Sequence, residues 1–460
     1  MSTLKRGFFI YPFAVLLIIT SCVSTREKVP EGGEKEKGQE KPVTEKEDPI
    51  AFYKGPEDVA KALEIMEELE NEQMDRDSRF LYYSLLISNN NIDEAVRQLE
   101  ILLQENRKDS EVLVAYITLM DYLGDTEKRD DALNSLIAID GENSFALNMK
   151  GTLALRNKNY SEAESLFSKS LRADPQNINS YIGRGNSLMH IKGREEESLA
   201  VFDAAEKINS ENPYIFSDRS RVLRFLKDYG RAEDDITKAI SLYPSEWNYL
   251  DRARIRISDL DDKTGAKEDL EEIIAINDSN FFANVYLAGI YDDEKNYDKA
   301  LLYYEKILTI ADDYYYAYPA LGKLYYIKGQ WDKAAEMYMK ASFSKSNEMT
   351  YPLMAYICYT YAGNDRKAKS IVNDNIGNLD RNSSIYEMYR YYLNPSSAYF
   401  VQLAIDKDEN EFMRNRMKYY LAMIDKINGR VDTAAVILHE IAVRKGAPEF
   451  ELASIELEKK

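Results

Sequence analysis

Two short stretches of the sequence concentrate arginine. SDRSRVLRF (residues 217–225) holds three arginines within six positions, and YLDRARIRI (residues 249–257) holds three more. A guanidinium presents a planar fork of N–H donors that can bind a carboxylate or phosphate through two parallel hydrogen bonds. These stretches are therefore candidates for anion recognition, although the chain as a whole is acidic, with a formal net charge of -19.

Other residues that could carry chemistry are sparse. The two histidines, His190 and His439, lie far apart, and the sequence has no HExxH or CxxC motif that would supply zinc ligands. The acidic run at residues 258–272 has Lys263 and Thr264 where a calcium-binding loop needs a ligand and a glycine. No nucleophile has a general base at a suitable spacing. We therefore predict a protein that is not an enzyme and has no metal site and no cofactor.

The acidic balance also bears on the class of partner. Nucleic-acid binding needs a basic footprint, because most of its affinity comes from neutralising phosphates. A net charge of -19 argues against such a partner, and its simplest role is to keep the protein soluble.

The first residues resemble a bacterial lipoprotein signal. Lys5 and Arg6 precede the apolar run FFIYPFAVLLIIT, which is too short for an ordinary membrane span. The run leads into Ile19-Thr20-Ser21-Cys22, which resembles a lipobox. The resemblance implies a signal peptide at residues 1–21 and lipid, such as palmitate, on Cys22. A plain signal peptide and an uncleaved anchor are the alternatives.

Residues 22–49 are expected to tether a folded body to the membrane. Between residues 23 and 49 there are six Lys or Arg, eight Asp or Glu, and no aromatic residue. Such a segment cannot bury enough apolar surface to offset the entropy lost on ordering. Val23, and not an aspartate, follows the cysteine. In Gram-negative lipoproteins, which this segment resembles, such a residue after the cysteine implies sorting to the outer membrane. We therefore expect a lipid-anchored protein of the bacterial cell envelope, in the outer membrane and facing the periplasm.

The body of the chain repeats a single unit. KNYSEA (158–163), KDYGRA (227–232), KNYDKA (295–300) and GQWDKA (329–334) share an aromatic residue three positions before an alanine. Around the last two, a tyrosine recurs every 34 residues, at Tyr291, Tyr325 and Tyr359. Apolar residues at i, i+3, i+4 and i+7 in each half predict two amphipathic helices per unit. Small residues such as Gly185 and Gly322 stand where the two helices would cross.

This pattern resembles the tetratricopeptide repeat. In one unit the match runs through Leu321, Gly322, Tyr325, Ala334 and Tyr338. The resemblance implies an all-α fold, a right-handed superhelical solenoid of stacked helix-turn-helix hairpins. Units are expected to begin near residues 76, 110, 144, 178, 213, 246, 281, 315, 349, 383 and 415.

The repeats divide the chain into segments. We expect an N-terminal capping helix in residues 50–75 and the repeat array in 76–382. Residues 383–414 form an irregular or degenerate repeat in this scheme, and 415–460 a C-terminal repeat with a capping helix. Solenoids need such caps because their terminal units otherwise expose an apolar face.

The repeat register separates the arginines by role. Arg219 and Arg252 fall at position 7 of their units, where a structural role is expected, with the head group paired to an acid. Arg221 and Arg254 fall at position 9, which in the family faces the inner groove. Each of these two arginines has two possible roles: it could recognise a ligand in the groove, or it could pair with the aspartate three residues before it. The sequence alone does not choose between them.

The family resemblance implies a binding surface on the inner face of the first helices. The candidate partner-binding residues at these inner positions are Arg221, Arg224, Arg254, Asn186, Asn148, Trp247, Tyr316, Lys323 and Tyr326. The leading hypothesis is a membrane-anchored scaffold that binds a protein partner or peptide segment, in envelope assembly or transport. The alternatives are a lipoprotein that binds a small anionic solute for a transporter, and a self-assembling structural protein.

Overall fold

The computed structural model describes residues 56–70, 74–343, 348–395 and 398–459. All regular elements in these ranges are α-helices, and none is long and apolar enough to cross a membrane. The predicted signal peptide (1–21), the lipidated Cys22 and the tether (22–49) lie outside the described residues.

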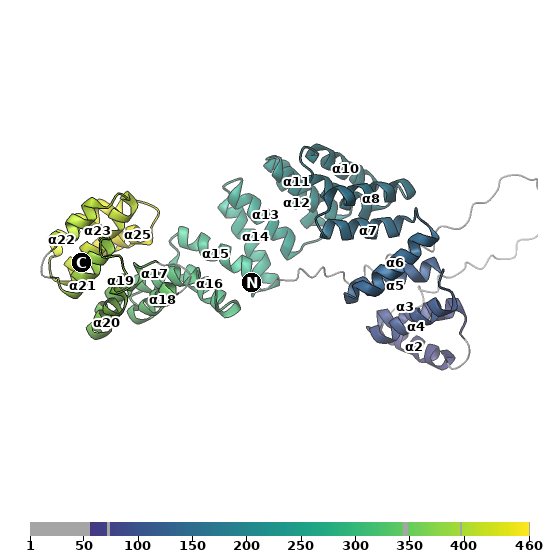
Figure 1. The fold of residues 1–460 in the computed structure, drawn as a ribbon, viewed down its shortest axis with the longest axis horizontal. Helices are drawn as coiled ribbons and strands as arrows, with labels where there is room; N and C mark the ends of the chain where they lie inside the picture. The colour runs from purple at the N-terminus through teal and green to yellow at the C-terminus, as the bar shows by residue number, and fades with distance from the viewer. Residues whose placement is uncertain (1–55, 71–73, 344–347, 396–397, 460) are drawn as a thin grey trace, which may run out of the picture. The chain divides into compact units, whose positions relative to one another are not determined.

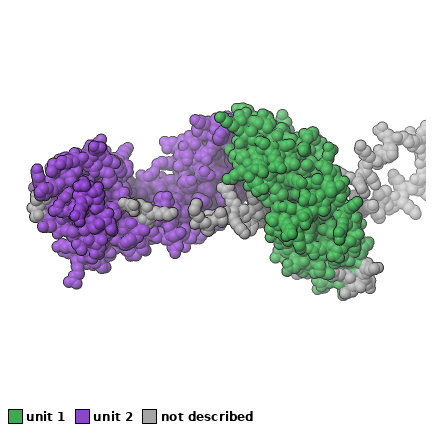
Figure 2. All heavy atoms as spheres, in the orientation of Figure 1, with its two compact units in different colours: residues 1–210 green, residues 211–460 purple. Residues whose placement is uncertain are grey.

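The chain divides into two compact units, coloured separately in Figure 2. Unit 1 ends at Ser210 and unit 2 begins at Glu211. Within the described residues, the helices of unit 1 are α2 (Pro56–Glu70), α3 (Arg76–Ser88), α4 (Ile92–Glu105), α5 (Ser110–Leu123), α6 (Thr126–Ile139), α7 (Ser144–Arg156), α8 (Tyr160–Ala173), α9 (Ile178–Met189) and α10 (Glu195–Ile208).

Unit 2 contains the remaining helices and the C-terminus. They are α11 (Pro213–Phe225), α12 (Tyr229–Leu242), α13 (Glu246–Ser258), α14 (Lys263–Ile276), α15 (Phe281–Asp293), α16 (Tyr297–Ile310), α17 (Ala317–Ile327), α18 (Trp331–Phe343), α19 (Tyr351–Tyr361), α20 (Asp365–Ile376), α21 (Ser384–Leu393), α22 (Tyr399–Lys407), α23 (Glu411–Ile427), α24 (Val431–Ala442) and α25 (Pro448–Glu458).

Within each unit, consecutive helices pair into hairpins that stack on one another (Figure 1). The first helices begin at or within a few residues of the predicted unit starts. An Asn or Asp side chain caps many of these helices, as Asn212 does by accepting from the N–H of Tyr214. The predicted all-α fold of stacked helical hairpins is confirmed.

The turns inside the hairpins share one backbone feature. Each turn from α3–α4 to α19–α20, and that of α23–α24, contains a residue with positive φ. In some turns it is a glycine, such as Gly329 at φ 70°, and in others a lysine, such as Lys295 at φ 58°. The lysine has to adopt a conformation that an L side chain disfavours.

The small residues of the repeat lie where helices cross. A Cβ added to Gly322 would stand 2.9 Å from the ring of Tyr338, and one added to Gly185 would stand 2.6 Å from Phe202. Gly183, which the repeat pattern did not single out, is tighter still, with the ring of Phe167 at 2.3 Å. The aromatic side chain of the second helix thus occupies the space that the glycine leaves on a first helix.

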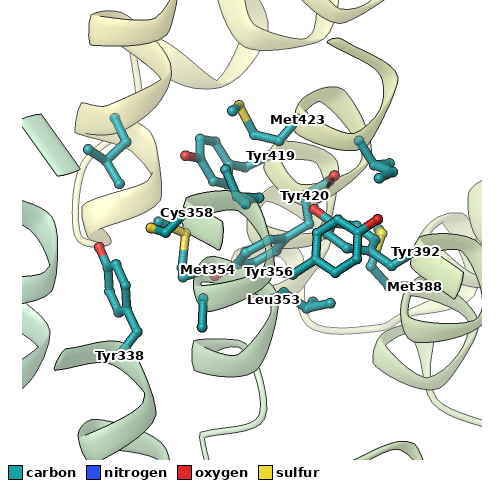
Figure 3. Close-up of a cluster of buried hydrophobic side chains, with 14 of the residues drawn as sticks. Tyr338, Leu353, Met354, Tyr356, Cys358, Met388, Tyr392, Tyr419, Tyr420 and Met423 are labelled. Atoms are coloured by element: carbon teal, nitrogen blue, oxygen red, sulfur yellow. Dashed lines mark hydrogen bonds between the residues drawn. The ribbon is translucent and has the colours of Figure 1, made fainter. Parts of the chain in front are cut away.

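The hydrophobic core formed by helices α17 to α25 of unit 2 is rich in tyrosine. Figure 3 shows Tyr338, Tyr356, Tyr392 and Tyr420 in the same buried cluster as Cys358. Burial raises the pKa of the Cys358 thiol. Cys358 is therefore an inert buried side chain.

The last hairpins differ from those before them. In residues 383–414, where an irregular repeat is predicted, α21 and α22 form a hairpin of shorter helices. After α23 and α24 a single helix, α25, packs on α24 and also contacts α23 and α17. α25 thus reaches a repeat far earlier in the chain.

Candidate functional site

The arginines at position 7 join the two helices of a hairpin. Arg219 of α11 donates two hydrogen bonds to Asp235 of α12, at 2.7 and 2.9 Å, and both side chains are buried. Arg252 of α13 makes the same connection to Asp269 of α14, at 2.6 Å. These guanidinium groups therefore serve the packing of their own hairpins, which is the role predicted for them.

The candidate groove arginines already have carboxylate partners within the chain. Arg221 donates to Asp218 at 2.9 Å and to Asp251 of the next repeat at 3.0 Å. Arg254 lies 3.6 Å from the same Asp251. The sequence left open whether the aspartates occupy these arginines, and the structure shows that they do. A further ligand would have to share or displace these carboxylates.

Arg224 is also paired with a carboxylate of this chain. Its Nε donates to Asp259, which caps the end of α13. Counted with Asp218 and Asp251, three aspartates face the three arginines of this surface. The three arginines and three aspartates of this surface therefore balance in charge.

Exposed aromatic rings occur at one repeated position on four first helices of unit 2. Tyr214, Trp247 and Phe282 are the second residues of α11, α13 and α15, and Tyr316 is the N-cap of α17. They are 59%, 65%, 47% and 63% exposed, respectively. We call these four residues the aromatic ladder. Trp247 and Tyr316 are among the predicted groove residues.

Tyr214 is not among the groove residues predicted from the sequence, although the repeat period could have indicated it. It lies 33 residues before Trp247, which is close to the period of the repeat. Apolar periodicity alone does not separate an exposed ring from a buried one, because both recur with the hairpin.

The two predicted asparagines lie in unit 1. Asn148 of α7 donates to the hydroxyl of Ser180 at 2.8 Å, which ties α7 to α9. Asn186 is half-buried on α9. The remaining predicted groove residues, including Arg221 and Trp247, belong to unit 2.

Lys323 and Tyr326 of α17 lie beneath the C-terminal helix. Lys323 is buried and donates to Asp292 at 2.7 Å and to Glu451 of α25 at 2.8 Å. Tyr326 is fully buried, and its hydroxyl donates to Glu456 of α25 at 2.8 Å. These two predicted groove residues therefore contact the chain's own last helix.

No metal centre is assembled by the residues that the structure describes. Among them, no group of three or more His, Cys, Asp or Glu side chains is arranged to hold an ion. His190 stacks on Tyr160 with ring centroids 4.5 Å apart, and His439 contacts the carbonyl of Ala435 one helical turn earlier.

Comparison with known families identifies the repeat. Two family models described as tetratricopeptide repeat match this chain, one at residues 117–178 and 148–213 and the other at 285–314. These ranges fall on the hairpins of α5–α10 and of α15–α16.

The chain is also similar to parts of two curated proteins. The human tetratricopeptide repeat protein 13 is 30% identical over 173 residues, which are 36% of this chain and 20% of that protein. The DnaJ homolog subfamily C member 7 homolog of Schizosaccharomyces pombe is 25% identical over 238 residues, 47% of this chain and 49% of that protein. The matched segments thus span half or less of these relatives.

Among solved structures, YrrB, described as a TPR protein with an unusual peptide-binding site, aligns with a TM-score of 0.35 at 20% identity. The alignment covers 40% of this chain and 95% of YrrB. The family matches and the hairpin architecture together show that this chain contains tetratricopeptide repeats.

Proposed function

We propose that this chain is a membrane-anchored scaffold that binds a protein partner through the first helices α11, α13, α15 and α17, without catalysing a reaction. The aromatic ladder is the observation that carries the proposal. Tetratricopeptide repeats are a protein-interaction fold, and aromatic side chains contribute much of the binding energy at protein interfaces. Four exposed rings in register supply a row of anchor points for one polypeptide segment.

In this proposal the arginines beside the aromatic ladder form the polar rim of the binding surface. Arg221 is 53% exposed on its side chain and keeps donors available beyond its bonds to Asp218 and Asp251. Such groups fix the direction of a bound segment more than they add affinity.

A small anionic solute fits this surface less well. It would have to share the arginines with Asp218, Asp251 or Asp259, or displace these aspartates, and the nearly neutral surface does not attract it. A protein segment can instead bury the rings and leave the ion pairs intact.

The anchor in this proposal is the lipid on Cys22, and the site of action is the bacterial cell envelope, at the periplasmic side of the outer membrane. The lipobox-like Ile19–Cys22 sequence and the charged segment that follows support this part. A Cys22→Ser chain is expected to leave the membrane fraction and to lose incorporation of labelled palmitate. Unchanged membrane association with no lipid on the wild type would contradict it.

Site-specific photocrosslinking in intact cells tests the binding surface. A photoreactive phenylalanine analogue at Trp247 or Tyr316 is expected to crosslink to one and the same protein. The matched control is Tyr399 of α22, which is equally exposed but lies outside the ladder. Crosslinking from Tyr399 as strong as from Trp247, or none from either ladder position, would contradict the proposal.

A further inference from the structure

α25 presents acidic side chains inward, where helices normally present apolar ones. Glu449 and Glu456 are buried together with Leu452 and Ala453. Their spacing of i, i+3, i+4 and i+7 places all four on one stripe of the helix. The inward stripe of α25 therefore has an apolar centre and a carboxylate at each end.

Glu449 is held by one cation and one phenol. Its Oε1 accepts hydrogen bonds from Arg416 of α23 at 2.6 and 2.9 Å and from the hydroxyl of Tyr420 at 2.7 Å. Glu451, beside the stripe, is held in the same way by Lys323 at 2.8 Å and by the hydroxyl of Tyr297 at 2.9 Å.

Glu456 has the largest set of donors. Lys426 of α23 donates to it at 2.8 Å, and the hydroxyls of Tyr326 and Tyr361 donate at 2.8 and 3.1 Å. Lys459, just after the helix, donates at 2.6 Å and also lies over the ring of Tyr326, 4.5 Å from its centroid. Each of the three carboxylates is thus recognised by a cation together with tyrosine hydroxyls from other helices.

The groove under α25 requires an acidic occupant. Arg416 and Lys323 are buried, and Lys426 is largely so. Without α25, Lys323 would keep Asp292 and Arg416 would keep Glu348, but each cation would lose one of its two carboxylates. Buried cations that lose their partners are strongly unfavourable, so departure of α25 favours entry of another acidic segment.

The contact between α25 and the groove is incomplete. A cavity of about 40 Å³ remains between Tyr351, Arg416, Pro448 and Glu449. The Oε2 atom of Glu449 is buried but has no hydrogen-bond partner among the described residues. A short connector, residues 443–447, joins α25 to α24. A single helix on a short connector with an imperfect fit can be exchanged more readily than a repeat hairpin.

We propose that the groove formed by α17, α19 and α23 is a binding site for an acidic amphipathic helix of a partner protein, and that α25 is its resident occupant. The groove selects the pattern Glu-x-x-Leu-Ala-x-x-Glu with a further Glu two residues after the first. A partner helix with this pattern displaces α25. The site shares α17 with the aromatic ladder but uses other residues, Lys323 and Tyr326 in place of Tyr316, so the proposal does not depend on the function proposed above.

A partner helix must compete with α25 for the groove, so α25 determines how tightly the partner has to bind. A short connector holds α25 at an effective concentration on the order of millimolar. The apparent affinity for a competing helix is lowered by the fraction of chains in which the groove is filled. Weakening α25 alone, with the groove untouched, therefore raises the affinity for an added helix.

A labelled peptide with the sequence of residues 447–459 tests the site on full-length chains. The chain with Glu451→Lys is expected to bind it about tenfold more tightly than the wild type, because Lys323 repels the substituted α25. The matched control is Glu458→Lys, an exposed position on the same helix, which is expected to bind like the wild type. A peptide that itself carries Glu451→Lys is expected not to bind.

Three results would overturn the proposal. Equal peptide affinity in all three chains would show that the groove does not accept a helix in trans. Loss of the helical circular dichroism signal in the Glu451→Lys chain would make α25 a fixed part of the fold. Doubling of the mass of the Glu451→Lys chain in light scattering, reversed by the peptide, would assign the groove to a second copy of this chain.

Discussion

Lys323 of α17 and Glu451 of α25 are 128 residues apart in the sequence, and their Nζ and Oε2 atoms lie 2.8 Å apart. Asp292 of α15 accepts from the same ammonium at 2.7 Å. Burial lowers the pKa of Lys323, but the two carboxylates raise it by more, so it lies above its ordinary value of 10.5. Lys323 is therefore a charged junction among three helices, and both acids depend on it.

Replacing this junction is expected to be costly. Lys323→Ala leaves Asp292 and Glu451 close together without their cation, and we expect it to lower the free energy of unfolding by about 3 kcal/mol. Lys328→Ala is the control, since Lys328 pairs with Asp298 on the surface, and we expect a change within about 0.5 kcal/mol. Urea denaturation followed by circular dichroism measures both. Similar losses in the two variants would show that the buried junction has no special weight.

Two glycines on neighbouring first helices are expected to respond in opposite directions to alanine. Gly322→Ala places a methyl group 2.9 Å from the ring of Tyr338 and should cost about 1–3 kcal/mol of stability. Gly289, inside α15, has nothing within 4 Å of an added Cβ, so Gly289→Ala should stabilise by roughly 0.5–1 kcal/mol. Thermal unfolding of both variants decides the matter. Stabilisation by Gly322→Ala would mean that Tyr338 moves aside freely.

The hairpins could be predicted because their signals are local and repeated. The tyrosines at Tyr291, Tyr325 and Tyr359 and the alanines at Ala300 and Ala334 recur with the period of one unit. Each pair of helices is specified within about 30 residues, so pattern and propensity agree without any knowledge of distant contacts.

The surroundings of the candidate site could not be predicted in the same way. The repeat position of Lys323 and Tyr326 places them on an inner face, but nothing in the period indicates that α25 covers that face. The contacts of Glu451 with Lys323 and of Glu456 with Tyr326 join residues more than 100 positions apart, and such pairings leave no periodic signal. Likewise, the spacing of Asp218 and Arg221 predicts one ion pair but not the second, from Asp251 of the next repeat.

Backbone conformation in the turns leads to a further prediction. Lys295 is exposed and adopts φ 58°, so Lys295→Gly should relieve strain and stabilise the fold by roughly 0.5–1 kcal/mol. Gly329 holds the equivalent place one repeat later at φ 70°, and Gly329→Ala should destabilise by about 1 kcal/mol. Denaturation midpoints of the two variants should shift in opposite directions. A shift of both in the same direction would show that the turn does not store this strain.

Acidification is expected to loosen α25 through Glu456. Burial raises the pKa of this carboxyl, but hydrogen bonds from Lys426, Lys459 and Tyr326 lower it by more, with Tyr361 donating as well, so the pKa lies below its ordinary value of 4.5. A carboxyl whose pKa is depressed on folding contributes stability above its unfolded pKa and loses it as the pH falls through the folded value.

The contribution of Glu456 should thus be complete at neutral pH and decline below about pH 4.5. Thermal unfolding of the wild type and of Glu456→Gln, compared from pH 7 to pH 3, isolates it. The two chains should differ most at neutral pH and converge in acid, whereas Glu458→Gln, exposed on the same helix, should track the wild type throughout. A constant difference between the wild type and Glu456→Gln across this range would show that the negative charge of Glu456 does not hold α25 in place.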